Sequence, residues 1–354
     1  MGKTTAFCAF LLTLLVFPPF GTAQESFELR VFLNFDSGTN IFDLDWSFDS
    51  TLLAFVDRND IVSIVDVKTV SGGSPLSRVE DEIYVLKAVA WRTNHYQLLI
   101  ANNLTKIWNY SENKWLDDFE VPSAIKFEAY TTEGNVDWRP DGSQFSILLR
   151  GCEEGTPYRP GARVEVWDVT SSTFFQIAGC VWTPPFIAKW NPQGTQLAIT
   201  GFAVFDEEGF VKSEEIEIWN VDTRERLLAI SGLKDPSGLD WSPDGDMIAF
   251  TTIIGVDQFL QVRDVTNGEI ISQAKANLAV YVPLDWHPSE NLIATGGQDG
   301  SVRIWDALTG SELIELPVHE DTVQDVSWSP DGSRLASAGR DGQLFIWNVL
   351  GLQN

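Results

Sequence analysis

The chain has 354 residues, 44 % of them apolar, and its 24 Lys and Arg stand against 50 Asp and Glu, for a formal net charge of −26. This composition excludes a disordered chain, and the acidic balance argues against nucleic acid as a partner, because phosphate binding needs a basic face. With 14 Trp but only 3 His, the sequence offers little for a histidine-dependent hydrolase or a multi-histidine metal site, and we expect neither a metal nor a cofactor.

Residues 1–23 have the order of a secretory signal peptide. Lys3 is followed by an apolar run over 4–17, two prolines, and the small residues Gly21 and Ala23 at a cleavage site. The run is too short to span a bilayer comfortably, although an uncleaved anchor or a buried first strand is the alternative. We expect residues 24–354 to form the mature protein in an extracytoplasmic space, secreted or periplasmic, with no stable insertion in a membrane.

The rest of the chain repeats one unit seven times. Each unit has a Trp after a short apolar stretch, at intervals of 42 to 52 residues. These marker Trp residues are Trp46, Trp91, Trp138, Trp190, Trp241, Trp286 and Trp328. A turn such as Ser329–Gly332 follows, in which Pro fixes φ, Asp caps the turn and Gly takes positive φ. An apolar run after the turn predicts a second strand.

A third strand recurs 17 to 29 residues after each marker Trp, as in Val164–Val169 and Ile216–Val221. Polar and apolar residues alternate there, as on a strand with unlike faces, and a further turn and a fourth strand follow. Four strands repeated seven times, without helical periodicity, predict an all-β fold: a single seven-bladed β-propeller of four-stranded antiparallel blades. The abundance of Trp is then explained by packing within the blades.

The chain resembles the WD-repeat family over nearly all of residues 25–354, most clearly in its last unit. The family's structural hydrogen-bond set maps onto His319, Ser337, Asp341 and Trp347. The sixth unit keeps Thr295, Asp299 and Trp305 but has no matching His, and we expect the other blades to be held mainly by apolar packing. The turns also resemble those of periplasmic TolB-type propellers, whereas the Trp-Asp and Trp-Asn pairs favour the WD-repeat family.

The seventh unit leaves no room for its own fourth strand, because the chain ends at residue 354. Residues 25–34 alternate like an outer strand and precede the first complete unit. We therefore predict that this N-terminal strand completes the last blade and removes an exposed sheet edge.

The longest connections between second and third strands are residues 151–161 in the third unit and 201–210 in the fourth. They emerge at one end of the blades, which we call the upper face, as does the connection over 179–186. Aromatic and Arg side chains on such loops dominate many protein–protein interfaces. The candidate partner-binding residues are Tyr158, Arg159, Trp182, Phe186, Phe205 and Phe210. For Trp182 and Phe186, the alternative is that they merely cover the end of the blade.

Cys152 and Cys180 fall in two of these upper-face connections. In an oxidising compartment the pair predicts a disulfide, with two free thiols as the alternative. Asn103 and Asn109 begin glycosylation sequons, which matter only in a host that glycosylates exported proteins. Nearby acidic residues such as Glu207 and Glu208 favour a partner with a basic rim, although a solvated acidic loop would look the same.

The sequence therefore predicts a non-enzymatic scaffold that binds a protein or peptide through the upper-face loops of blades 3 and 4. The resemblance implies this function, because WD-repeat propellers are typically interaction platforms. No residues are assigned as catalytic. The alternative is a propeller enzyme or carbohydrate-binding protein with carboxylates at the mouth of the central channel, and a third possibility is a periplasmic assembly partner of the TolB kind.

Overall fold

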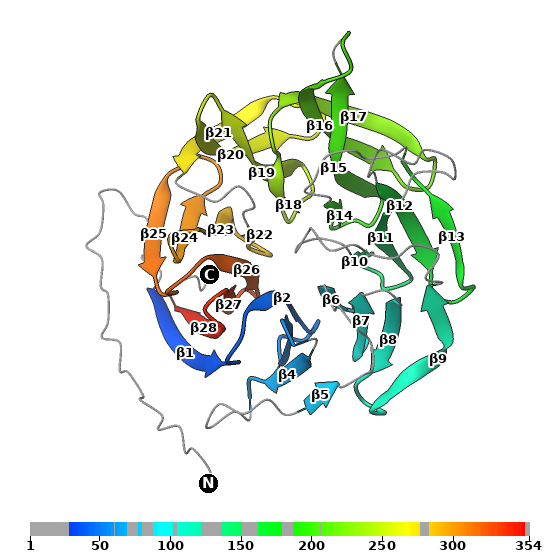
Figure 1. The fold of residues 1–354 in the computed structure, drawn as a ribbon, viewed down its shortest axis with the longest axis vertical. Helices are drawn as coiled ribbons and strands as arrows, with labels where there is room; N and C mark the ends of the chain where they lie inside the picture. The colour runs from blue at the N-terminus through cyan, green and yellow to red at the C-terminus, as the bar shows by residue number, and fades with distance from the viewer. Residues whose placement is uncertain are drawn as a thin grey trace.

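The structure is a computed structural model. It describes residues 28–59, 61–68, 77–79, 88–101, 105–121, 136–150, 162–178, 187–205, 207–276 and 283–350. Every regular element in these ranges is a β-strand, and the strands are arranged as blades around a centre (Figure 1). No helix in this part of the chain is long and apolar enough to cross a membrane.

Seven four-stranded antiparallel sheets form the blades, and each runs from an inner to an outer strand. Blade 1 consists of β2 (Ile41–Trp46), β3 (Leu52–Asp57), β4 (Val62–Asp66) and β5 (Ser77–Val79). Blade 2 consists of β6 (Ala88–Trp91), β7 (Gln97–Ala101), β8 (Thr105–Asn109) and β9 (Lys114–Val121). Blade 3 consists of β10 (Val136–Trp138), β11 (Gln144–Arg150), β12 (Ala162–Asp168) and β13 (Thr173–Gln176). Blade 4 consists of β14 (Ala188–Trp190), β15 (Gln196–Phe205), β16 (Val211–Asn220) and β17 (Glu225–Leu233). Blade 5 consists of β18 (Ser237–Trp241), β19 (Met247–Ile254), β20 (Asp257–Asp264) and β21 (Ile270–Ala276). Blade 6 consists of β22 (Leu284–Trp286), β23 (Leu292–Gly296), β24 (Ser301–Asp306) and β25 (Glu312–Pro317). Blade 7 consists of β26 (Val323–Trp328), β27 (Arg334–Gly339), β28 (Gln343–Leu350) and β1 (Glu28–Asp36). The predicted seven-bladed propeller is confirmed.

The N-terminal strand closes the last blade, as predicted. β1 pairs with β28 from Glu28 opposite Leu350 to Asp36 opposite Gln343, with one irregularity between Val31 and Leu33. Blade 7 therefore combines strands from both ends of the chain, and the two lie side by side in Figure 1. This pairing gives β28 a hydrogen-bonded neighbour on its outer side and links blade 7 to blade 1 through the chain itself.

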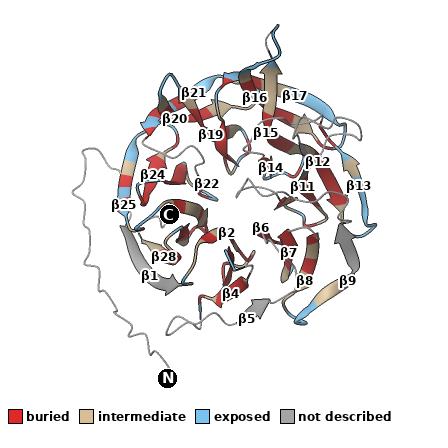
Figure 2. Ribbon diagram, in the orientation of Figure 1, coloured by how far each residue is buried: buried red, intermediate tan, exposed pale blue. Residues whose placement is uncertain are grey.

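The hydrophobic core is divided into seven layers, one at each junction between neighbouring blades. The layer between blades 7 and 1, for example, joins Phe55 and Leu53 of blade 1 to Leu344 and Ile346 of blade 7. The marker Trp residues lie in these layers and are all buried. Figure 2 shows buried residues concentrated on the inner strands and exposed ones on the outer strands of blades 3 to 6. Each blade is therefore stabilised by its two neighbours, which explains why ring closure matters.

The turns after the marker Trp residues have the geometry that their sequence predicts. In blade 7 the amide of Gly332 donates to the carbonyl of Ser329 at 2.7 Å, and Gly332 has φ of +67°. The Asp331 carboxylate accepts the Ser329 hydroxyl at 2.6 Å and the Ser333 amide at 3.0 Å. Asp therefore caps the turn locally, and Gly supplies a conformation that costs other residues free energy.

Candidate interaction surface and central channel

Aspartates lock neighbouring blades together around the central channel. Four marker Trp residues are directly preceded by Asp, and each of these carboxylates accepts the backbone N–H of the next blade's marker Trp. The bonds run from Trp91 to Asp45 (2.5 Å), from Trp190 to Asp137 (2.7 Å), from Trp286 to Asp240 (2.7 Å) and from Trp328 to Asp285 (2.5 Å). Because the acceptors are carboxylates, these are strong bonds, and each spans a blade junction.

The other three junctions have a different hydrogen bond, in which the donor is an indole N–H and the acceptor is a backbone carbonyl. Where Ala90, Lys189 or Ser327 precedes the marker Trp, the backbone carbonyl of that residue accepts the indole N–H of the next marker Trp. These bonds link Trp138 to Ala90 (3.0 Å), Trp241 to Lys189 (3.0 Å) and Trp46 to Ser327 (3.1 Å). All seven junctions therefore carry an inner hydrogen bond of one kind or the other. We call the residues that precede the marker Trp residues, together with Asp43 and Asp325, the inner ring.

The inner ring encloses a cavity of about 140 Å³ that is lined by the inner strands of all seven blades. Lys189 lies 3.8 Å from Asp137, and both side chains keep partial exposure, 34 % and 23 %, to this narrow space. Burial raises the pKa of Asp45 to about 7 and that of Asp137 to about 6. Burial alone would lower the pKa of Lys189, but the surrounding carboxylates outweigh it and raise this pKa above its ordinary value.

This geometry favours a structural role for the channel carboxylates over catalysis or sugar binding. The carboxylates are engaged by backbone amides, and the cavity is smaller than the roughly 300–1,000 Å³ of ordinary ligand pockets. Among the described residues, no group of three or more His, Cys, Asp or Glu side chains is arranged to hold a metal ion. A propeller enzyme or carbohydrate-binding protein would need carboxylates directed at a ligand, and the described residues of the channel do not support that alternative.

The longest strands of blade 4 form a hairpin that projects beyond the outline of the ring (Figure 1). The sequence predicted a long loop over 201–210, but pairing of β15 with β16 continues outward past a bulge between Ile199 and Phe202. Gly201, with φ of +95°, provides the backbone conformation at the bulge. At the tip, Phe205, Phe210 and Val211 are 37 %, 68 % and 47 % exposed. The hairpin therefore presents apolar side chains on an ordered support.

Blade 5 adds two exposed apolar residues at the same end of the blades, and sequence reasoning missed both. Ile254 and Val256 lie at the tight turn between β19 and β20 and are 44 % and 96 % exposed. The Ile253 amide donates to the carbonyl of Lys234 at 2.9 Å, next to the end of β17. Blades 4 and 5 are thus joined at this end. We call Phe205, Phe210, Val211, Ile254 and Val256 the upper-face patch.

Of the six residues predicted to bind a partner, the structure describes Phe205 and Phe210, and both are exposed. The other four, Tyr158, Arg159, Trp182 and Phe186, lie outside the described residues, as do residues 1–23, Cys152, Cys180 and Asn103. Asn109 of the second sequon is described, and its side-chain oxygen accepts the Glu112 amide at 3.2 Å. The pairing of the cysteines and the use of the sequons stay predictions.

The proposed structural set of blade 7 lies together. His319 Nδ1 is 3.1 Å from the Asp341 carboxylate, and His319 Nε2 is 2.7 Å from the Ser337 hydroxyl. Trp347 is buried on β28, where its ring stacks on Phe345 with centroids 5.7 Å apart. Burial alone would raise the pKa of Asp341, but bonds from His319 and from the amides of Gln343 and Glu320 hold it below its usual range.

Blades 3, 4 and 6 satisfy their third-strand indoles with other partners. In blade 6, Trp305 donates to the Thr295 hydroxyl at 2.8 Å. In blades 3 and 4 the acceptors are nearly buried glutamates two residues before the Trp: Glu165 accepts from Trp167 at 2.9 Å, and Glu217 accepts from Trp219 at 3.0 Å. Each glutamate also pairs with an Arg. In blades 3 and 4, polar bonds therefore contribute beside the apolar packing that was expected from the sequence.

Comparison with known families agrees with this geometry. Residues 310–348 match the model of the WD domain, G-beta repeat, and residues 241–328 match that of the anaphase-promoting complex subunit 4 WD40 domain. These matches fall on three of the seven blades that the structure closes into one ring. The chain carries WD repeats within a seven-bladed β-propeller. WD-repeat propellers are typically scaffolds for protein–protein interaction.

Curated relatives of this WD-repeat propeller match parts of the chain. It is 31 % identical to mouse WD repeat-containing protein 90 over 39 % of this chain and 7 % of the relative. It is 29 % identical to the COMPASS component SWD3 of Saccharomyces cerevisiae over 39 % of this chain and 40 % of the relative. It is 25 % identical to the anaphase-promoting complex subunit cdc20 of Dictyostelium discoideum over 64 % of this chain and 41 % of the relative. The chain thus spans less than half the length of each.

Proposed function

We propose that this WD-repeat propeller is a non-enzymatic, extracytoplasmic scaffold that binds a protein or peptide through its upper-face patch. The observation that carries the proposal is the β15–β16 hairpin, which holds Phe205, Phe210 and Val211 outside the ring with their apolar surface exposed. Aromatic side chains of this kind contribute much of the binding free energy at protein interfaces. The extracytoplasmic location rests on the signal-like segment at residues 1–23.

The charge around the hairpin indicates the kind of partner. Glu207 and Glu208 are exposed beside Phe210 at the tip, and the whole chain carries a net charge of −26. A partner with an apolar centre and a basic rim would meet both features, and its association rate would fall with added salt. Names of two relatives, a COMPASS component and an anaphase-promoting complex subunit, belong to members of multi-component assemblies and are in keeping with a scaffold role.

The test is capture of partners from the extracytoplasmic fraction of the native host with three folded proteins. The first is the parent, and the second carries F205S, F210S and V256S. The third carries L227S, I270S and L308S, which change residues of similar exposure elsewhere on the ring. We expect the parent and the third protein to retain the same partner and the second to lose at least about tenfold in capture, the effect of about 1.4 kcal/mol. Equal capture by all three would contradict the proposed surface.

A further inference from the structure

Two pairs of carboxyl groups meet across blade junctions in the inner ring. The Asp325 carboxylate of blade 7 accepts the amide of Leu44, the residue after Asp43 of blade 1, and the Asp240 carboxylate of blade 5 accepts the amide of Trp286, the residue after Asp285 of blade 6. The two carboxyl groups of each pair therefore lie close enough to interact. An ionised carboxylate only accepts hydrogen bonds, so two of them cannot bond to each other without a proton. A proton shared within a pair lets its two carboxyl groups bond, and losing that proton to water leaves two like charges side by side.

Backbone amides hold the four carboxyl groups in place. Asp325 accepts the Leu44 amide at 2.8 Å, and Asp43 accepts the Val89 amide at 2.7 Å. Asp240 and Asp285 accept the amides of the next marker Trp residues, as described above. A carboxyl group that turned away from its partner would lose a bond between blades. After deprotonation, repulsion between the two carboxylates of a pair therefore acts across the blade junction and weakens it.

Six of the seven blades contribute charged groups to the inner ring. Blade 1 contributes Asp43 and Asp45, blade 3 Asp137, blade 4 Lys189, blade 5 Asp240, blade 6 Asp285 and blade 7 Asp325. The described residues that blade 2 presents there are Ala88, Val89 and Ala90, which carry no charge. In the described part of the chain, Lys189 is the single cation among six carboxyl groups there. One ammonium cannot neutralise six carboxylates, so further protons are needed to limit repulsion in this narrow space.

We propose that the shared protons make the inner ring a pH-operated clamp, which holds the propeller closed more tightly at mildly acidic pH than at neutral or basic pH. Carboxyl groups of the unfolded chain release their protons near pH 4, whereas burial raises the pKa of Asp43, Asp240 and Asp285 in the two pairs above its ordinary value. Burial also raises the pKa of Asp45 and Asp137, to about 7 and about 6. At these carboxyl groups the folded protein therefore binds more protons than the unfolded chain between about pH 4 and pH 7. Its stability falls as the pH rises through this window.

The test compares melting temperatures at pH 5.5 and pH 7.5. D43N with D285N replaces one acid of each pair by an amide, whose oxygen still accepts the backbone N–H and whose NH2 donates to the remaining carboxylate at any pH. The control, D222N with D246N, removes the same charge from exposed residues. We expect the parent and the control to melt about 5 °C higher at pH 5.5 than at pH 7.5. The D43N/D285N protein should lose most of this difference by melting higher at pH 7.5.

A second variant keeps the proposal testable if the double substitution disturbs folding. K189M removes the cation of the ring, so we expect its melting temperature to fall more at pH 7.5 than at pH 5.5. Its control is K212M, at an exposed position on β16, which should not change the dependence on pH. The proposal is overturned if D43N/D285N keeps the parent's pH dependence, or if K189M lowers the melting temperature equally at both pH values.

Discussion

A chain that begins at Ser37, and so lacks β1, is expected to melt on the order of 10 °C below one that begins at Gln24. The deletion removes pairing with β28 that runs from Glu28 opposite Leu350 to Asp36 opposite Gln343. Blade 7 would keep only β26, β27 and β28, with the outer edge of β28 open to solvent and to other chains. Differential scanning calorimetry with light scattering would measure both the lower transition and the increased self-association.

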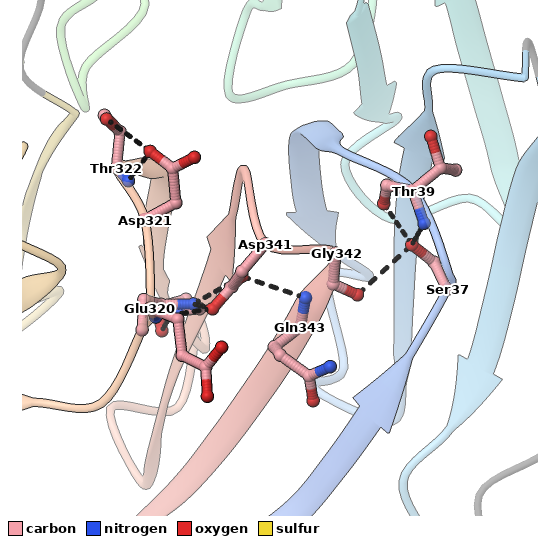
Figure 3. Close-up of polar contacts among 10 residues, drawn as sticks. Ser37, Thr39, Glu320, Asp321, Thr322, Asp341, Gly342 and Gln343 are labelled. Carbon is pink, nitrogen blue, oxygen red and sulfur yellow. Dashed lines mark hydrogen bonds and ion pairs between the residues drawn. The ribbon is translucent and has the colours of Figure 1, made fainter.

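A point substitution tests the same closure without removing a strand. The Ser37 amide donates to the carbonyl of Gly342 at 2.9 Å, and the Ser37 hydroxyl donates to it at 3.2 Å (Figure 3). Gly342 has φ of +81°, and a Cβ there would lie 2.8 Å from the Thr39 carbonyl oxygen. G342A should therefore destabilise the junction through both backbone strain and a steric clash.

Gly255 provides a matched control, because its φ is +69° and a Cβ there would meet nothing within 4 Å. G255A carries only the backbone strain, about 1–2 kcal/mol, so we expect G342A to lower the melting temperature further than G255A. If the shortened chain melted like the full one, or if G342A matched G255A, β1 and the turn that it contacts would contribute little to holding the ring closed.

Local patterns were enough to predict the blades. The marker Trp residues, the turns after them and the alternation of the third strands depend on residues close in sequence, so each unit could be recognised alone. The strand over 25–34 was predicted in the same way, and β1 is observed at Glu28–Asp36. This strand was predicted to complete blade 7, and its pairing with β28 confirms that prediction.

The inner ring depends on contacts that spacing cannot supply. The Asp-Trp pairs at 45–46 and 285–286 are visible in the sequence, but the amide that each carboxylate accepts belongs to the next blade. Asp43 and Asp325 are separated by nearly the whole chain and meet only because the ring closes between them. The signal that sequence reasoning had available was the recurrence of Asp directly before Trp, and it became meaningful only with the arrangement of the blades.

The upper-face patch was predicted in part, for a different reason. An insertion of the length of residues 201–210 shows that a connection is longer than its neighbours, but it does not show whether backbone pairing continues into it. The apolar run Phe202–Phe205, with its aromatic and β-branched residues, would have been the signal for a continued strand. Ile254 and Val256 were missed because the β19–β20 turn is short, and sequence reasoning looked for binding residues in long loops.

D341A is expected to lower the free energy of unfolding by about 1–3 kcal/mol, the cost of leaving a buried hydrogen-bond donor without its acceptor. The Asp341 carboxylate accepts from His319 Nδ1 at 3.1 Å, from the Glu320 amide at 2.8 Å and from the Gln343 amide at 3.0 Å, and Figure 3 shows the last two bonds. The His319 side chain is fully buried. Without Asp341, its Nδ1–H would have no acceptor, and the bond between His319 Nε2 and the Ser337 hydroxyl would lose its orientation.

Asp306 supplies the comparison for this substitution, because its carboxylate also accepts two backbone amides, from Leu308 and Thr309, but on an exposed turn. D306A should therefore destabilise the protein much less than D341A in urea denaturation at pH 7. A similar loss in the two variants would show that the His319 contact adds nothing beyond an ordinary turn cap.

The pH dependence of the D341A effect has the opposite sign to that of the inner ring. The pKa of Asp341 is held below its usual range, so its stabilisation is complete above about pH 4 and is lost as the pH falls through the lowered pKa. The gap between parent and D341A should be full at pH 7.5 and at pH 5.5 and should narrow only below about pH 4. The inner-ring variants change their behaviour between pH 5.5 and pH 7.5 instead. One pH series on both sets of variants therefore separates the carboxylate that stabilises blade 7 as an anion from the carboxyl groups that close the ring by holding protons.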